Sequence, residues 1–243
     1  MKLDQFKDIV KHTHSLGFID MVKLVGTATD AKIEAIDADK TVVVYGEMYQ
    51  PVNDIAVTVG LSRLAQLKGF IDLHEKSTVS VTNEVRGAVS VPTELKFDDG
   101  AGDIAIYRFM SESMANEQIK VPPFKGATWN VSIKPEKARI DRLSSYQGVL
   151  GSFEKRFIVS TDKDVLNFSI GSGPTDRTNI PFAKGITGTL KHQWSWPLTQ
   201  VLSILKLNDN EDVKMHFSDM GALKIDIDSG IGKYSYILPA GKA

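Results

Sequence analysis

The chain has 243 residues, 42% of them hydrophobic and 24% charged, and its formal net charge at pH 7 is −1. This composition is typical of a soluble globular protein with one or two domains, and it excludes a simple cationic protein that coats DNA. The absence of cysteine excludes disulfides and thiolate metal sites. No segment has the apolar run of a signal peptide or a membrane span, so we expect an intracellular protein that does not contact the membrane.

The first half of the chain predicts two helices and several short strands. Helical spacing of Phe6, Ile9 and Leu16 predicts a helix over residues 3–16 with a polar side that includes Asp8. A second helix is expected over 61–68, closed by Gly69. Strands rich in Val and Ile, separated by turn-forming residues, are predicted over residues 19–26, 32–37, 41–48, 54–60, 77–81, 93–99 and 103–110.

A change of composition marks a boundary between domains. The segment SESMANEQIKVPPFK, residues 111–125, is polar and ends in a double proline, which favours extended backbone and cannot lie in a central strand. We therefore predict a first domain over residues 1–110, a connector over 111–127 and a second domain over 128–243.

The second half repeats the order of the first. Pro135 opens a helix predicted to end near Leu150, and Pro197 opens a shorter helix that ends near 207. The strands are predicted over residues 128–133, 156–161, 165–171, 187–194, 212–217, 222–228 and 233–240. The two long helices begin about 132 residues apart and the two short ones about 136, which indicates a duplicated α+β domain.

Motifs for catalysis or metal binding are missing from the sequence. His12 and His14 are two residues apart, so on a helix they point in directions about 160° apart and cannot share a metal ion; we interpret them as surface residues. The glycine-rich stretches at Gly171 and Gly230 lack the Gly-Lys-Ser/Thr ending of a phosphate-binding loop and are interpreted as turns. We therefore expect no metal, no cofactor and no enzymatic activity.

Charge is distributed unevenly between the predicted elements. Helices at 3–16, 61–70, 135–150 and 197–207 hold eight basic and four acidic residues, a net charge of +4, whereas the remainder of the chain has 21 basic and 26 acidic residues, a net charge of −5. A solvated helix surface explains this pattern in part. The alternative is that all four helices face one polyanion and the sheets face outward.

The order, spacing and hydrophobic pattern of these elements resemble those of the DNA sliding clamps, the processivity factors of replicative polymerases. The resemblance is closest to clamps of T-even-type bacteriophages, and proliferating cell nuclear antigen is a more distant relative. It covers nearly the whole chain and depends on the segments MKLDQFKDIVKHTH, VTVGLSRLAQLKGFIDL, SIKPEKARIDRLSSYQGVL, RFIVSTDKDVLNFSIG, WPLTQVLSILKLNDNEDVKMHFSDMGALKIDI and YSYILPA.

The resemblance implies an α+β fold of duplicated clamp domains, each with two helices packed on antiparallel sheets, that assembles into a closed ring. Six domains form such a ring, so a chain of two domains implies a homotrimer around duplex DNA, and the expected partners are DNA polymerase and a clamp loader. The expected location is the cytoplasm of the infected bacterial host. The best candidates for DNA contact in the channel are Lys7, Lys11, Arg63, Lys137 and Arg142, followed by Lys68, Arg139 and Lys206.

Clamps also bind short partner peptides in an apolar pocket beside the connector between domains. By resemblance, this pocket is expected to involve Val121, Pro122, Phe124, Tyr236, Leu238 and Pro239. Two other interpretations stay open at this point: a duplicated structural or assembly module of a phage, and an enzyme with an unrecognised site.

Overall fold

A computed structural model describes residues 3–52, 55–87, 89–174, 176–207 and 212–242, and the chain divides into two compact units. Unit 1 comprises Met1–Pro122 and Ser229–Tyr234, and unit 2 comprises Pro123–Asp228 and Ser235–Ala243. The division at Pro122 lies inside the predicted connector. The turn at Ser229–Tyr234 belongs to unit 1, although the residues on both sides of it in the sequence belong to unit 2.

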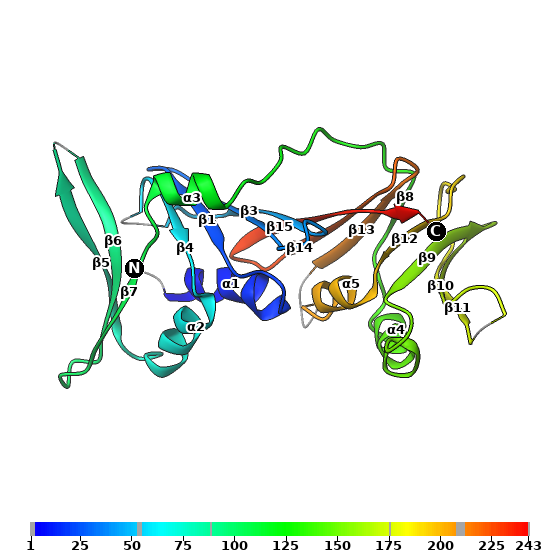
Figure 1. The fold of residues 1–243 in the computed structure, drawn as a ribbon, viewed down its shortest axis with the longest axis horizontal. Coiled ribbons are helices and arrows are strands. Elements are labelled where there is room, and N and C mark those ends of the chain that lie inside the picture. Colours follow the sequence, from blue (N-terminus) through cyan, green and yellow to red (C-terminus); the bar gives the residue numbers. More distant parts are fainter. Residues whose placement is uncertain (1–2, 53–54, 88, 175, 208–211, 243) are drawn as a thin grey trace. The chain divides into compact units, whose positions relative to one another are not determined.

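In its described residues, unit 1 contains three α-helices and seven complete strands, whose arrangement Figure 1 shows. The helices are α1 (Leu3–His12), α2 (Leu64–Leu73) and α3 (Glu112–Gln118), with a short 3-10 turn at His14–Leu16. The strands are β1 (Val22–Gly26), β2 (Ala31–Ile36), β3 (Val43–Met48), β4 (Thr58–Leu61), β5 (Thr78–Arg86), β6 (Val89–Asp98) and β7 (Ile104–Arg108). One sheet has the order β4-β1-β2-β3, continued by the first residues of β15 (Gly232–Pro239), and the other has the order β5-β6-β7.

The part of unit 2 that the structure describes contains two helices, α4 (Lys137–Leu150) and α5 (Leu198–Leu205). Its strands are β8 (Val131–Ile133), β9 (Arg156–Asp162), β10 (Val165–Ile170), β11 (Thr178–Lys184), β12 (Trp194–Pro197), β13 (Asp212–Ser218), β14 (Ala222–Asp228), the second part of β15, and β16 (Gly241–Lys242). One sheet has the order β11-β10-β9-β12-β16, and the other runs β15-β14-β13-β8. The neighbouring strands β11, β10, β9, β12 and β16 pair in antiparallel fashion, as do β14, β13 and β8.

The two halves share one order of elements, which confirms the duplicated α+β fold. In each half a helix precedes four strands, a second helix and three more strands. The strand order β4-β1-β2-β3 of the first half corresponds to β12-β9-β10-β11 of the second. In the same way β5-β6-β7 corresponds to β13-β14-β15.

Helix α1 is shorter than predicted, and its polar side was partly misassigned. Phe6, Ile9 and Val10 are buried as the spacing predicts, but Asp8 and His12 are buried as well. The prediction that His12 is a surface residue is therefore wrong. The helix ends at His12, where the Thr13 hydroxyl donates to the carbonyl of Ile9, and Gly17 in a left-handed conformation closes the following 3-10 turn.

Helix α2 (Leu64–Leu73) begins three residues later and ends five residues later than the predicted 61–68. Arg63 adopts a left-handed conformation with φ of 53°, so the helix begins after it, at Leu64. The buried stripe of Leu64, Leu67 and Ile71 continues past Gly69, so this glycine is a helix interior residue rather than a C-cap. Packing of this stripe outweighs the modest helix propensity lost at one glycine.

The connector and one strand also differ from the sequence prediction. Residues 112–118 form α3, with Ser111 as N-cap, because Ala115 and Ile119 are buried. The strand predicted over residues 187–194 does not form over 187–193. The strand that follows β10 in the chain and pairs with it is β11 (Thr178–Lys184), which contains Pro181 and was not predicted. Proline is tolerated there because β11 lies at the end of the strand order, next to a register shift in β10.

Aromatic side chains form the core of unit 2 between helix α5 and its sheets. Phe168 stacks on Phe182 with ring centroids 3.9 Å apart, and Phe157 and Phe217 contact the same cluster. Trp196 is fully buried, and its indole N–H donates to the carbonyl oxygen of Leu238 at 3.1 Å. Helices α4 and α5 both bury their hydrophobic faces in the core of unit 2, so their polar faces point to solvent. None of the helices in the described residues is long and apolar enough to span a membrane.

Candidate nucleic-acid interface

Helices α1 and α2 lie side by side in unit 1 (Figure 1). Basic side chains of both helices line the space between them. A hollow of about 490 Å³ separates their exposed faces, and its polar lining includes Lys7, Lys11, Lys68, Asp72 and Glu75. Because the apolar sides of both helices pack on the sheets, these charged groups all reach solvent. The three lysines outnumber the two carboxylates, so the hollow is weakly positive.

An ion pair connects the two helices across this hollow. The Lys7 ammonium lies 2.8 Å from a carboxylate oxygen of Glu75, which follows α2. The hydrogen bond between them raises the pKa of Lys7 and lowers the pKa of Glu75, so both groups stay charged around neutral pH. Lys68 is paired with Asp72 one turn later on α2. A phosphate that binds here therefore competes with carboxylates, which weakens the contact and makes it easier to exchange.

Helix α4 presents the basic side chains of unit 2. Lys137 and Arg142 are exposed and Arg139 is half-buried. The Arg142 guanidinium lies 4.8 Å from the ring centre of Tyr146 and donates to its hydroxyl at 3.0 Å, which holds it along the helix surface. The adjacent helix α5 is joined to α4 by a hydrogen bond from Gln147 to Thr199.

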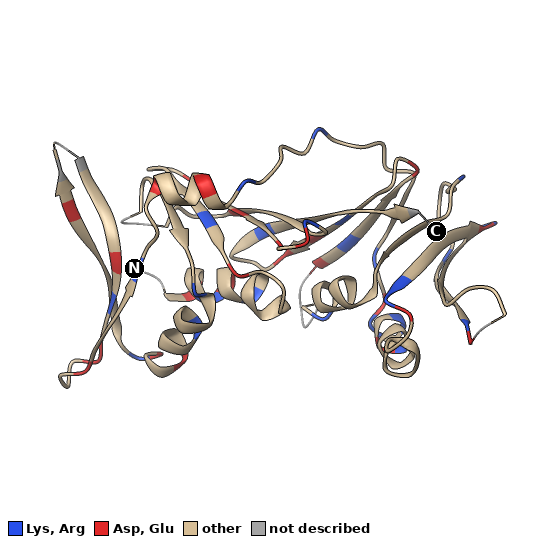
Figure 2. Cartoon of the chain, in the orientation of Figure 1, with Lys and Arg blue, Asp and Glu red and all other residues tan. Residues whose placement is uncertain are grey.

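The observed helix bounds change the charge count. Together α1, α2, α4 and α5 hold six basic and four acidic side chains, a net charge of +2 rather than the predicted +4. Arg63, Glu136 and Lys206 flank the helices, whereas Asp72 lies inside α2. Asp8 is buried, so the exposed faces carry six basic and three acidic groups. Figure 2 shows the basic segments on the helices of both units.

The expected peptide-pocket residues have very different exposures. Tyr236 and Leu238 are fully buried, so their side chains belong to the core and cannot contact a partner in this structure. Pro122 and Pro239 are exposed, and Val121 is half-buried. Phe124 is 40% exposed and stacks on Trp129 with centroids 6.1 Å apart. The exposed surface of this predicted set is therefore limited to the four residues other than Tyr236 and Leu238.

Trp129 rests on a row of polar side chains across the sheet of unit 2. Its ring contacts His216 and lies 5.6 Å from the Lys224 ammonium. His216 lies opposite both Ser132 and Lys224 in the strand register, and its Nδ1 is 2.8 Å from the Ser132 hydroxyl. His216 Nε2 is 3.3 Å from Asp226.

The Ser132–His216–Asp226 chain superficially resembles a hydrolytic triad. Strand register accounts for it, however, since it extends along cross-strand neighbours. Lys224 and Ser235 also bind the Asp226 carboxylate. We interpret the row as a structural network that supports Trp129.

Comparison with solved structures identifies the fold, whereas comparison of sequences finds no match. No family model matches the chain, and no curated protein matches it. The structure of A. fulgidus PCNA bound to the C-terminal region of FEN-1 aligns with 100% of this chain and 97% of its own, with a TM-score of 0.73 and 12% identity. The fold is that of proliferating cell nuclear antigen (PCNA), a sliding clamp.

Two further PCNA structures support the same fold. PCNA of Thermococcus kodakaraensis aligns with 99% of this chain and 98% of its own, at a TM-score of 0.70 and 12% identity. PCNA of Entamoeba histolytica aligns with 98% of this chain and 96% of its own, at a TM-score of 0.68 and 11% identity. At this identity the similarity establishes the PCNA fold and not the partners.

Sequence reasoning missed several contacts that position these groups on the PCNA fold. It found Lys7 but not Glu75, which binds it from a distant part of the chain. It found Phe124 but not Trp129, on which Phe124 stacks. An exposed lysine and an aromatic residue in a loop carry no local signal of their partners, because pairing is set by the tertiary fold.

Leu238→Ala should destabilise the fold, whereas Phe124→Ala should leave it nearly unchanged. Leu238 is fully buried, and truncating such a leucine costs about 2–5 kcal/mol in unfolding free energy. Phe124 is 40% exposed and loses far less buried area. Denaturant unfolding of the two variants measures the difference. Equal stability of the two variants would show that Leu238 lies outside the core.

Asp226 should make the stability depend on pH in the acid range. Burial alone raises the pKa of Asp226, but hydrogen bonds from His216, Lys224 and Ser235 outweigh it and lower the pKa from 3.8 to about 2. A lowered folded-state pKa contributes stability that is complete above about pH 4 and is lost as the pH falls to about 2. After discounting for partial exposure, the contribution is roughly 1–2 kcal/mol.

The measurement compares the free energy of unfolding of the wild type with that of Asp226→Asn between about pH 2 and pH 6, which covers the titration. The stability difference should be largest at the upper end and shrink toward the lower end. Asp39→Asn, at an exposed turn position, is the matched control. A difference that stays constant across this range would contradict the lowered pKa.

Proposed function

We propose that the chain is a sliding clamp, closest to those of T-even-type bacteriophages, that encircles duplex DNA and tethers the replicative polymerase. It acts with a clamp loader in the cytoplasm of the infected bacterial host. The observation that carries this proposal is that both halves of a PCNA-like fold direct basic side chains to solvent from helices, α1 and α2 in the first half and α4 in the second. A channel lined by such helices attracts a polyanion without reading its sequence.

The charge arrangement suits a clamp that slides. A ring linked topologically to DNA needs no tight grip, and lysine or arginine contacts with phosphates carry no sequence information. The carboxylates beside Lys7 and Lys68 keep the local field modest. Weak, equivalent contacts exchange easily as the duplex moves, so processivity comes from the ring and not from affinity.

The assembly that we propose is a homotrimer closed through edge strands. In unit 1, β3 lies beside the start of β15. In the duplicated fold, β11 is the counterpart of β3, and β7 is the counterpart of β15. The pairing of β3 with β15 therefore suggests that β11 of one protomer pairs with β7 of the next. Such head-to-tail pairing closes into a ring when the rotation is correct.

Exposed apolar side chains next to these two strands support the same assembly. Ile104 and Ile106 on β7 are 54% and 50% exposed. Close to β11, Val149 at the end of α4 and Phe153 in the turn after it are 71% and 88% exposed, and both line a hollow of about 640 Å³. Large apolar groups at matched edges are a recognised mark of a protein interface.

Partner binding is proposed at the connector. A. fulgidus PCNA binds the C-terminal region of FEN-1. By analogy, the polymerase and the loader of this protein are proposed to dock peptides near Val121, Pro122, Phe124 and Pro239. Phe124 supplies an exposed aromatic anchor of the kind in which interface energy is concentrated.

Charge reversal on the helices should remove clamp activity without unfolding the protein. We would change Lys11, Arg63, Lys137 and Arg142, which are all exposed, to glutamate. Repulsion of phosphate should then impair loading and processive primer extension, while the solution mass stays that of the wild type. The control reverses four exposed lysines outside these helices: Lys40, Lys120, Lys163 and Lys191. Normal extension by the helix variant would show that these residues do not face DNA.

Phe153→Glu should dissociate the assembly. A charge at an 88% exposed position hardly affects folding, but its burial in an interface is costly. Light scattering should give about three times 26.7 kDa for the wild type and a smaller mass for the variant. Met220→Glu, at a 73% exposed apolar side chain in the turn before β14, is the control and should keep the wild-type mass. A monomeric wild type at micromolar concentration would refute the trimer.

A further inference from the structure

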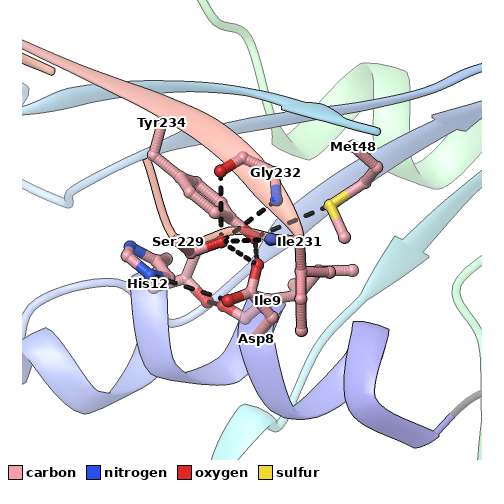
Figure 3. A network of polar contacts seen from close by, with 9 residues as sticks. Asp8, Ile9, His12, Met48, Ser229, Ile231, Gly232 and Tyr234 are labelled. Atoms are coloured by element: carbon pink, nitrogen blue, oxygen red, sulfur yellow. Dashed lines mark hydrogen bonds and ion pairs between the residues drawn. The ribbon is translucent and has the colours of Figure 1, made fainter. Parts of the chain in front are cut away.

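A buried polar network ties helix α1 to a turn from the far end of the chain (Figure 3). Asp8 and His12 lie on the inner side of α1, and Ser229 and Tyr234 come from the turn and the start of β15 that belong to unit 1. Asp8 is 7% exposed, His12 0% and Tyr234 1%. More than 220 residues separate the two sides in sequence.

The Asp8 carboxylate is the centre of this network. Its Oδ2 accepts a hydrogen bond from the Tyr234 hydroxyl at 2.7 Å and lies 3.1 Å from the Ser229 hydroxyl. Its Oδ1 lies 3.7 Å from His12 Nε2. The His12 ring stacks on the Tyr234 ring, with centroids 4.0 Å apart and planes 7° apart. Ser229 in turn accepts the backbone N–H groups of two residues in its own turn, so the turn itself is ordered.

The network fixes the rotation of α1 about its axis. Asp8 and His12 are four residues apart and share one side of the helix. Lys7 and Lys11 directly precede them, so the direction of both lysines follows from where Asp8 and His12 are held. A ten-residue helix is marginal in isolation, so tertiary contacts set its order.

The corresponding helix of the second half, α4, buries no charged side chain. The buried residues of α4 are Ile140 and Leu143. A buried carboxylate must be compensated by its partners, and its directional hydrogen bonds define one orientation where apolar contacts allow several. The polar network is therefore a device for orientation more than for stability.

We propose that Asp8 and Tyr234 are positioning residues, which hold α1 in the orientation that presents Lys7 and Lys11 to DNA. This inference rests on the proposed function, because it assigns those lysines to DNA. It makes the DNA-facing geometry of the N-terminal helix depend on a turn encoded more than 200 residues later.

The first test is hydrogen exchange in Tyr234→Phe, which removes one hydroxyl and keeps the ring stacked on His12. Exchange of the α1 amides should accelerate by about tenfold or more, the effect of losing a hydrogen bond to a charged acceptor. The control is Tyr107→Phe in the same unit, whose buried hydroxyl donates to the carbonyl of Ser62 before α2. If Tyr234→Phe accelerates α1 exchange no more than Tyr107→Phe does, the proposal is overturned.

The second test asks whether Tyr234 acts through the lysines. Loader-dependent primer extension is measured for Tyr234→Phe, for Lys7→Ala with Lys11→Ala, and for all three changes together. If Tyr234 positions the lysines, the triple variant should be no worse than the lysine pair, because the two effects share one route. Losses that multiply would mean that Tyr234 acts independently of Lys7 and Lys11, and would overturn the proposal.

The two readouts separate failure of this inference from failure of the proposed function. If the wild-type chain does not stimulate the polymerase, the clamp function fails, and the exchange comparison still decides whether Tyr234 holds α1. If the wild type is active and α1 exchange is unchanged in Tyr234→Phe, the positioning inference fails alone.

Discussion

Burial of one face of each helix against an antiparallel sheet is the constraint on which the rest of this structure depends. Leu64, Leu67 and Ile71 of α2 show the principle, since they leave only the opposite face for solvent. Once the apolar face is committed, the charges on the remaining face decide what the surface attracts. The same constraint operates in both halves of the duplicated fold, so two similar basic surfaces arise from sequences with little residue identity.

The sequence predicted α1, α2, α4, α5 and most strands, but not α3, because hydrophobic periodicity is a local property and the short polar helix α3 has little of it. It also identified basic residues that the structure leaves at least partly exposed, since a lysine opposite an apolar stripe has few alternatives. Element ends were less predictable: α2 extends through Gly69 because Ile71 is buried on the sheet. The strand β11 was missed because Pro181 is acceptable only at the end of a strand order, which a local pattern does not reveal.

Contacts over long sequence separations were out of reach. Asp8 and His12 were assigned to the polar face because both residue types usually prefer water, and their compensating partner Tyr234 is more than 220 residues away. Tyr236 and Leu238 were expected in a pocket, but alternation in a strand does not say whether its apolar face meets a core or a partner. In both cases the missing information was the identity of the neighbouring element.

Topological linkage to DNA is the central claim, and retention on circular against linear duplex tests it most directly. The protein would be loaded by its loader on a closed circular duplex, transferred to high salt, and followed before and after a single cut. A clamp should stay on the circle, since salt screens phosphate contacts but leaves the link intact, and should be lost once free ends appear. Equal retention on circular and linear DNA would contradict this account.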